Sequence, residues 1–266
     1  MSEPAELHEL ASGVRLVAPE DASLIRLALP DRPGALALVS SRLAACSVNI
    51  LRLEVVARED GTAIDDLLVA GGDLAGALAS LEPDVRLLAC RERGELPDPG
   101  LAMAAACASV TAAAGAGEAR RRLLDAALKL GIADDGLILR DAGHGWLRPV
   151  ASRVEHLPPI RAHEPSVARA AVGSGRPVVA RGEEQWASPV YRSRFGAGHV
   201  LAVPGGVPPF FALTVIRRDE FPFVEAEITR LQALVRVAVG TLAAFGERAV
   251  QAPERPAVQL RLGSHR

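Results

Sequence analysis

The feature that most constrains the fold is an apolar segment that ends in a tight turn and continues as an amphipathic segment. Residues 24–29 are apolar apart from Arg26, and the turn 31–34 reads Asp-Arg-Pro-Gly. Pro33 suits a first helical turn, where its missing N–H has no role. Apolar residues then recur at helical spacing, at Leu36, Val39 and Leu43. The pattern predicts a strand, a turn and a helix, followed by a second strand that starts at Asn49.

This turn also has a chemical consequence. A short turn that opens a helix presents free backbone N–H groups and the positive end of the helix dipole. Such a helix start suits a small anion or a carboxylate. The sequence therefore predicts a binding site rather than a catalytic one.

The same alternation of elements continues to residue 91. Strands are predicted at 23–29, 49–58, 62–70 and 85–90, and Asp60-Gly61 is a hairpin-turn dipeptide. Asp73 is placed to cap a second helix that Pro83 ends. The order strand-helix-strand-strand-helix-strand predicts an α+β, ferredoxin-like βαββαβ domain over residues 23–91.

The turn and the segment Val48-Asn49-Ile50, at this spacing, resemble an ACT domain, a regulatory module that senses amino acids. The resemblance implies that two such domains pair side by side, with the effector between the first helix of one and the strands of the other. It implies two sets of ligand-binding residues: Asp31, Pro33, Gly34, Ala35 and Leu36 through the backbone, and Asn49 and Ile50 opposite. Ser47 departs from the family, which often has glycine there.

Residues 92–100 hold charges, two prolines and two glycines and are interpreted as a linker. The sequence pattern of residues 101–250 predicts a second domain, an antiparallel sheet flanked by helices. The segments Ala168–Val179, 200–204, 211–217 and Phe221-Pro222-Phe223 with Glu225 are similar to a GAF domain. We interpret residues 1–22 as an N-terminal extension and predict that residues 251–266 are disordered.

Aromatic residues are only 3% of the chain, which makes the cluster near residue 190 notable. One hypothesis is a GAF ligand pocket, and the other is ordinary core packing. The residues concerned are Trp186, Tyr191, Arg192 and Phe195. GAF domains that bind bilins or reduce methionine sulfoxide use cysteines, and no cysteine follows Cys107.

Composition disfavours several other functions. The net charge of -2 gives no basic face for nucleic acid, and no apolar run is long enough for a membrane span. The three cysteines predict no disulfide framework and favour the cytoplasm. Spacings among His144, His156, His163 and His199 match no metal signature. Neither a G-x-S-x-G elbow nor a nucleotide-binding glycine loop is present, so no catalytic residue and no cofactor is predicted.

Together these patterns predict a cytoplasmic, non-enzymatic regulatory protein that forms a homodimer and binds a small molecule, most simply an amino acid. Its mechanism would be a ligand-linked shift between quaternary arrangements. Two alternatives stay open at this point. One is a degenerate ACT–GAF dimerisation scaffold that binds a protein partner, and the other is an enzyme with an unrecognised site.

Overall fold

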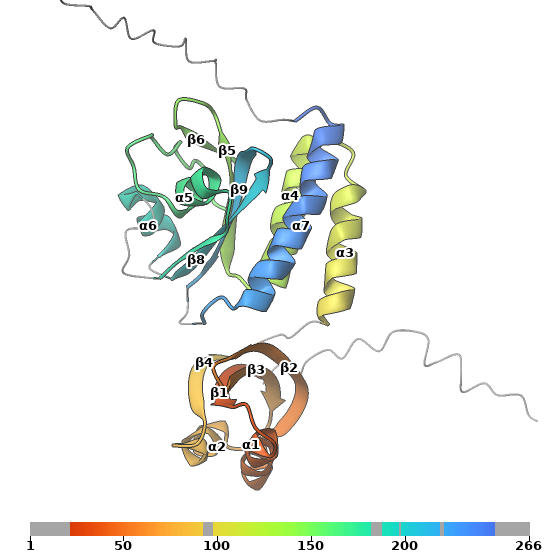
Figure 1. Ribbon diagram of the computed structural model, residues 1–266, viewed down its shortest axis with the longest axis vertical. Helices are drawn as coiled ribbons and strands as arrows, with labels where there is room; N and C mark the ends of the chain where they lie inside the picture. Colours follow the sequence, from red (N-terminus) through yellow and green to blue (C-terminus); the bar gives the residue numbers. More distant parts are fainter. Residues whose placement is uncertain (1–21, 93–97, 182–187, 197, 219–220, 248–266) are drawn as a thin grey trace, which may run out of the picture. The chain divides into compact units, whose positions relative to one another are not determined.

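The computed structural model describes residues 22–92, 98–181, 188–196, 198–218 and 221–247. The chain divides into two compact units, with the division between Leu96 and Pro97. Each unit is an antiparallel sheet flanked by helices (Figure 1). The predicted extension apart from Ala22, most of the linker and the predicted tail lie outside the described residues, as does Trp186.

The first unit is a four-stranded sheet with two helices. Its elements are β1 (Ser23–Pro30), α1 (Ala35–Ala45), β2 (Asn49–Glu59), β3 (Thr62–Ala70), α2 (Leu74–Leu81) and β4 (Arg86–Glu92). The strand order is β2-β3-β1-β4, with every neighbouring pair antiparallel. This topology confirms the predicted ferredoxin-like βαββαβ pattern.

Period-two alternation decides which side of this sheet packs against the helices. Ile25, Leu27 and Leu29 of β1 share one face, and the register places Leu67 and Ala63 of β3 beside them. They form one buried cluster with residues of α1 and α2, including Val39, Leu43, Ala77 and Leu81. Leu36, which the helical spacing placed in the core stripe, is instead 38% exposed, so that part of the prediction is wrong.

The second unit has a five-stranded antiparallel sheet with the order β6-β5-β9-β8-β7. Its strands are β5 (Asp135–Asp141), β6 (Leu147–Ser152), β7 (Val178–Ala180), β8 (His199–Gly206) and β9 (Pro209–Arg217). Its helices are α3 (Pro99–Thr111), α4 (Ala116–Leu130), α5 (Val167–Ser174), α6 (Pro189–Phe195) and α7 (Glu225–Ala244).

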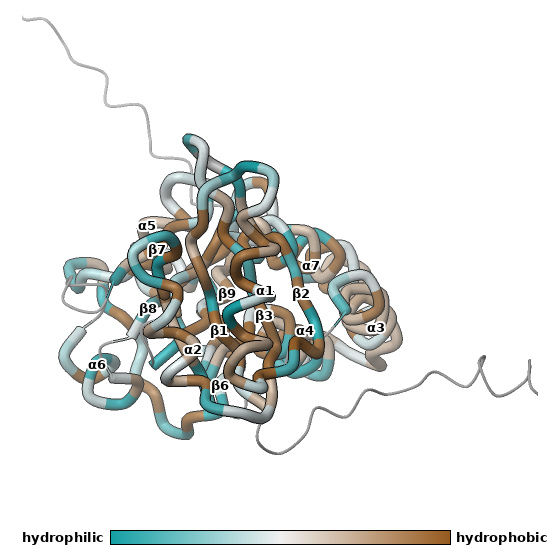
Figure 2. Tube along the Cα trace, turned by 90° about the horizontal axis from the view of Figure 1, so that it is seen from below, coloured by the Kyte–Doolittle hydropathy of each residue, from teal (hydrophilic) through white to brown (hydrophobic). Residues whose placement is uncertain are grey.

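Helices cover both faces of this sheet (Figure 1). The side chains of Leu213 and Val215 in β9 pack with α4 and α7, and α3 packs on the same two helices. Ala212 and Ile216 point to the other face and pack with α5 and α6. Apolar colouring in Figure 2 follows the strands, whereas many of the connecting loops are paler or hydrophilic.

Two elements differ from their predicted bounds for local reasons. Pro189–Phe195 is a short helix that the sequence pattern does not predict. A helix of two turns holds too few apolar positions to show a period. Apolar residues at helical spacing predict a long last helix that Pro222 opens. The helix instead begins at Glu225, because Val224 is extended and its amide donates to the Glu227 side chain.

Candidate functional site

The turn after β1 is held in place by the neighbouring hairpin. The amide of Asp31 donates to the carbonyl oxygen of Gly61 over 2.8 Å. Asp60 and Gly61 both have positive φ, at 48° and 75°, as the predicted two-residue hairpin turn requires. Pairing of Pro30 with Thr62 places both turns at the same end of the sheet.

Gly34 begins α1 from the left-handed region, with φ 90° and ψ -13°. No side chain caps this helix. The carbonyl of Gly34 accepts from the amide of Leu38 at 3.0 Å, and the carbonyl of Arg32 accepts from Ala35 at 3.3 Å. Within the part of the chain that the structure describes, the amides of Leu36 and Ala37 have no acceptor. The start of α1 therefore presents the free donors that the sequence predicted.

The residues of the turn 31–34 and of the start of α1 are accessible to solvent. Asp31, Pro33, Gly34 and Leu36 are exposed, and Ala35 is half-buried. Among the described residues, Asp31 forms an ion pair with Arg58 alone. The Arg58 Nε atom lies 3.9 Å from Asp31 Oδ1, and both side chains are well exposed. An exposed pair at that distance is worth little, so both groups remain available to a ligand.

Asn49 and Ile50 lie at the other end of the same sheet. Asn49 pairs with Ala70, the last residue of β3, whereas the turn lies beside Thr62, the first. Eight residue steps along a strand span about 27 Å. One copy of the unit therefore does not bring the two predicted sets of ligand-binding residues together, and their meeting across an interface stays a prediction.

The turn between α1 and β2 shows how Ser47 substitutes for glycine. Val48 donates to the carbonyl of Leu43 at 3.0 Å, and Ser47 donates to Ala44 at 2.9 Å. These two bonds define a Schellman motif, whose residue after the C-cap is left-handed. Ser47 adopts that conformation with φ 59°. The turn before Asn49 thus forms without the glycine, at the expense of backbone strain.

Ser47→Gly is therefore expected to raise the free energy of unfolding of the first unit by about 1 kcal/mol, because glycine adopts positive φ without a Cβ clash. The measurement is hydrogen exchange of the buried amides of β1 and β3. Ser41→Gly is the control, since Ser41 is an exposed residue inside α1 and its replacement should lower stability by roughly 0.5 kcal/mol. Equal effects at both positions would contradict the strain at Ser47.

In the second unit, two of the residues proposed for a pocket, Tyr191 and Phe195, are core residues. Tyr191 is 1% exposed and Phe195 is fully buried, with ring centroids 6.2 Å apart. Both belong to the apolar cluster between the sheet and helices α5 and α6. The Tyr191 hydroxyl donates to the carbonyl of Pro158 at 2.6 Å, and burial, with the charge of Glu164 adding to it, raises the pKa of Tyr191. Arg192 is half-buried on the same helix.

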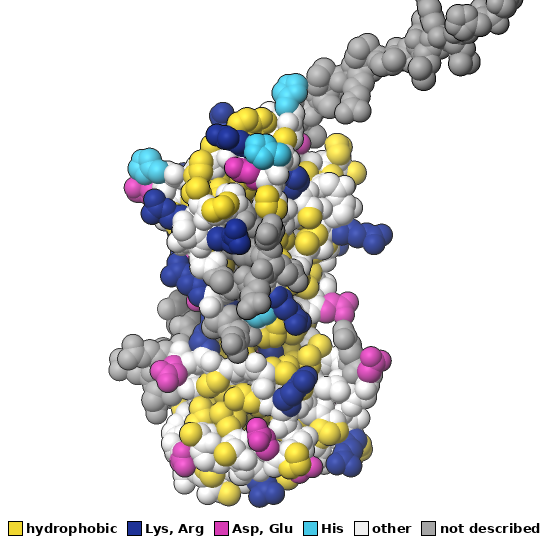
Figure 3. Space-filling model, turned by 90° about the vertical axis from the view of Figure 1, so that its left-hand side faces the viewer, with side chains coloured by type: hydrophobic (Ala, Val, Ile, Leu, Met, Phe, Trp, Pro, Cys, Tyr) yellow, Lys and Arg dark blue, Asp and Glu magenta, His cyan; other side chains and the backbone are white. Residues whose placement is uncertain are grey.

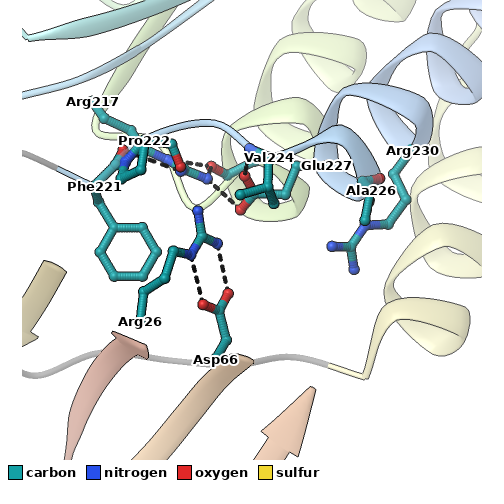
Figure 4. Close-up of polar contacts among 10 residues, drawn as sticks. Arg26, Asp66, Arg217, Phe221, Pro222, Val224, Ala226, Glu227 and Arg230 are labelled. Atoms are coloured by element: carbon teal, nitrogen blue, oxygen red, sulfur yellow. Dashed lines mark hydrogen bonds and ion pairs between the residues drawn. The ribbon is translucent and has the colours of Figure 1, made fainter. Parts of the chain in front are cut away.

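Sequence reasoning missed a buried polar cluster centred on Arg217 at the end of β9 (Figure 4). Arg217 Nη2 lies 2.6 Å from Glu227 Oε1, and the two side chains are 0% and 1% exposed. Arg217 also donates from Nε to the carbonyl of Gly131 at 3.0 Å and from Nη1 to that of Pro222 at 2.8 Å. Its guanidinium stacks 4.1 Å from the centroid of Phe223. The cluster joins β9, the end of α4 and the start of α7.

Two acidic residues of β3 were also missed. Asp66 accepts two hydrogen bonds of 2.6 Å from Arg26, its partner on β1, on the face of the sheet opposite α1 and α2 (Figure 4). Asp65 points to the helix-covered face, where Ala63 and Leu67 flank it. An acidic residue at an inward position of a predicted strand is the signal that would have identified Asp65.

Charged side chains on the face drawn in Figure 3 are of both signs and interspersed. Among the described residues, no group of three or more His, Cys, Asp or Glu side chains is placed to hold a metal ion. Within the same residues, no helix is both long enough and apolar enough to cross a membrane.

No protein-family model and no curated protein matches the sequence. Solved structures do match. The GAF domain of nlh2 from A. aeolicus is 14% identical, with a TM-score of 0.46, over 55% of this chain and 96% of that one. The GAF domain of a phosphoenolpyruvate-protein phosphotransferase from Coxiella burnetii is 14% identical, with a TM-score of 0.48, over 55% and 93%.

A third match is the free methionine-R-sulfoxide reductase from Neisseria meningitidis, 13% identical with a TM-score of 0.47 over 57% of this chain and 95% of that one. At such identities and TM-scores the similarity determines no ligand, activity or partner for this chain.

Proposed function

We propose that this chain is a non-enzymatic sensor that binds an amino acid through an ACT domain formed by its first unit. The observation that carries the proposal is the exposed, uncapped start of α1, which Gly34 opens and the Asp60-Gly61 hairpin holds in place. Its free amides suit the carboxylate that every amino acid carries. The ACT resemblance of the turn and of Asn49 supports the same ligand class.

Pairing of two copies would complete the site. β2 is an edge strand, and such an edge offers unpaired backbone groups to a second strand. Two β2 edges related by a two-fold axis pair antiparallel, which places Asn49 of one copy beside the turn end of the other. An amino acid held there would contact both copies and shift the population toward the paired arrangement.

The second unit would act as a GAF-like regulatory domain that carries a second ligand or relays the change. Helices on both faces of an antiparallel sheet, together with the Phe221-Pro222-Phe223 segment that leads into α7, support this assignment. The three cysteines are free in the structure, which favours the cytoplasm as the compartment.

The test is a thermal-shift screen of the full chain against the twenty amino acids and cyclic nucleotides. A ligand that binds only the folded state, at 100 times its dissociation constant, adds about 2.7 kcal/mol of stability. A shift with one amino acid supports the proposal and identifies the effector. A shift with a nucleotide alone moves sensing to the second unit, and no shift favours the scaffold alternative.

Asn49→Ala is expected to weaken amino-acid binding by about 10-fold or more, because a hydrogen bond to a charged ligand group is lost at an exposed strand end. Isothermal titration of the effector found in the screen measures the affinity. Arg86→Ala is the control, since Arg86 is exposed on β4, the opposite edge of the sheet. An unchanged affinity in Asn49→Ala would show that the proposed site is wrong.

A further inference from the structure

Two arginines of the second unit lie side by side at one end of its sheet. Arg140 of β5 and Arg148 of β6 are directly paired in the antiparallel register. Directly paired residues point to the same face of a sheet, with their Cβ atoms about 5 Å apart. Arg148 is exposed, and Arg140 is half-buried. Like charges in this arrangement repel each other and destabilise the strand pair, so their presence calls for an explanation.

No acidic residue of the described chain offsets these two charges. Neither guanidinium forms a hydrogen bond or an ion pair with another described residue. Arg153, which follows β6, does have such a partner, Asp125, at 3.1 Å. Asp141 is the acidic residue nearest in sequence, but strand alternation directs its side chain to the opposite face, and its Oδ1 accepts from the Gly143 amide at 2.8 Å. The two guanidiniums are therefore open to an anion from outside the chain.

Trp146 adds an aromatic ring to the same face. The Ala142 amide donates to the carbonyl of Trp146 at 2.9 Å, which continues the pairing of β5 with β6 beyond the strand ends. Trp146 lies two residues, about 7 Å, along the chain from Arg148, so the two side chains point the same way. The Trp146 side chain is 41% exposed, whereas Leu147 between them is 2% exposed. Two cations and an accessible ring thus share one end of the sheet.

We propose that Arg140 and Arg148 bind the phosphate group of a small phosphate monoester whose ring stacks on Trp146. A phosphate monoester carries close to two negative charges at pH 7, and arginine binds phosphate through two parallel N–H donors. One such dianion matches two adjacent guanidiniums and removes their repulsion. The exposed indole offers the flat surface on which a planar ring stacks.

The inference rests on the proposed function, because it names the second ligand that the second unit would carry. It does not depend on the amino-acid site of the first unit. The net charge of -2 disfavours a polyanion such as a nucleic-acid strand, so a small ligand fits the chain better.

Isothermal titration of the full chain with four probes tests the proposed chemistry. The probes are AMP, inorganic phosphate, adenosine and cyclic AMP. Inorganic phosphate lacks the ring, adenosine lacks the phosphate, and cyclic AMP is a phosphodiester with one negative charge instead of two. We expect AMP to bind at least about 10-fold more tightly than each of the other three, because it alone supplies both the dianion and the ring.

Two variants test the residues. Arg148→Gln should lower the affinity for AMP by about 10–100-fold, and Trp146→Ala should lower it while leaving the affinity for inorganic phosphate unchanged. Arg194→Gln is the control, since Arg194 is an exposed arginine of α6, on the other face of the sheet, and its change should alter neither affinity. Without ligand, Arg148→Gln should unfold at the same urea concentration as wild type or a higher one, because it removes the repulsion from Arg140.

The outcomes separate this inference from the proposed function. If Arg148→Gln binds AMP as wild type does, or if cyclic AMP binds as tightly as AMP, the site is overturned. If Arg148→Gln unfolds at clearly lower urea, Arg148 is a structural residue and the inference is overturned as well. If wild type binds none of the four probes, the inference fails, whereas an amino acid that raises the melting temperature in the screen still supports the sensor function.

Discussion

Glu227→Ala is expected to lower the free energy of unfolding of the second unit by about 3–5 kcal/mol, because it removes a buried carboxylate that pairs with the buried Arg217 guanidinium at 2.6 Å. The loss includes the hydrogen bond from the Val224 amide to Glu227 Oε2, 3.0 Å long, which sets the start of α7. Urea unfolding followed by tryptophan emission measures it. Both tryptophans, Trp146 and Trp186, belong to the second unit, so the signal reports that unit alone.

Glu225→Ala is the matched control. Glu225 lies in the same first turn of α7, two residues before Glu227, but it is exposed. Its removal should change stability by no more than about 0.5 kcal/mol. Similar losses for the two variants would mean that helix-dipole effects, which both residues share, outweigh the buried ion pair.

Phe195→Ala should lower the stability of the second unit by about 3–5 kcal/mol, since it removes a fully buried ring from the cluster between the sheet and α5 and α6. The same urea titration measures this loss. The measurement also distinguishes core packing from a ligand pocket at the aromatic cluster. Truncating a ring that lines an open pocket would lower the free energy of unfolding much less.

Val190→Ala on the same helix is the comparison for Phe195. Val190 is 47% exposed, and its truncation should be close to neutral. A loss below about 1 kcal/mol for Phe195→Ala would contradict its place in the core and return the segment to the pocket hypothesis.

Local elements were predictable because their signals are local. β3 has the predicted bounds, Thr62–Ala70, and Asp73 caps α2 by accepting from the Gly76 amide at 2.9 Å. Gly131 was expected to close α4 and does follow its last residue, but its φ is -88°, and the left-handed residue at this helix end is Ile132, with φ 44°. Ser47 shows a limit of this reasoning: it departs from the glycine that the resembled family often has, yet the Schellman bonds form with serine in the left-handed conformation.

The candidate site was predictable only in part. The exposed start of α1 follows from the turn 31–34, whose residues act on their immediate neighbours. Asn49 was placed on a strand correctly, but its position at the far end of the sheet follows from the register of β2 on β3. Register depends on the pairing of whole strands and on bulges such as the one between Ile50 and Arg52, so no short motif encodes it.

The sequence by itself determined the order of strands and helices in the first unit, the α+β class and the chemistry offered at the start of α1. Only the tertiary structure decided that Asp65 lies unpaired in the core, that Glu227 rather than Glu225 pairs with Arg217, and that Tyr191 and Phe195 are core residues. The physical reason is that periodicity shows which residues share a face, whereas packing between elements far apart in sequence decides what each face meets.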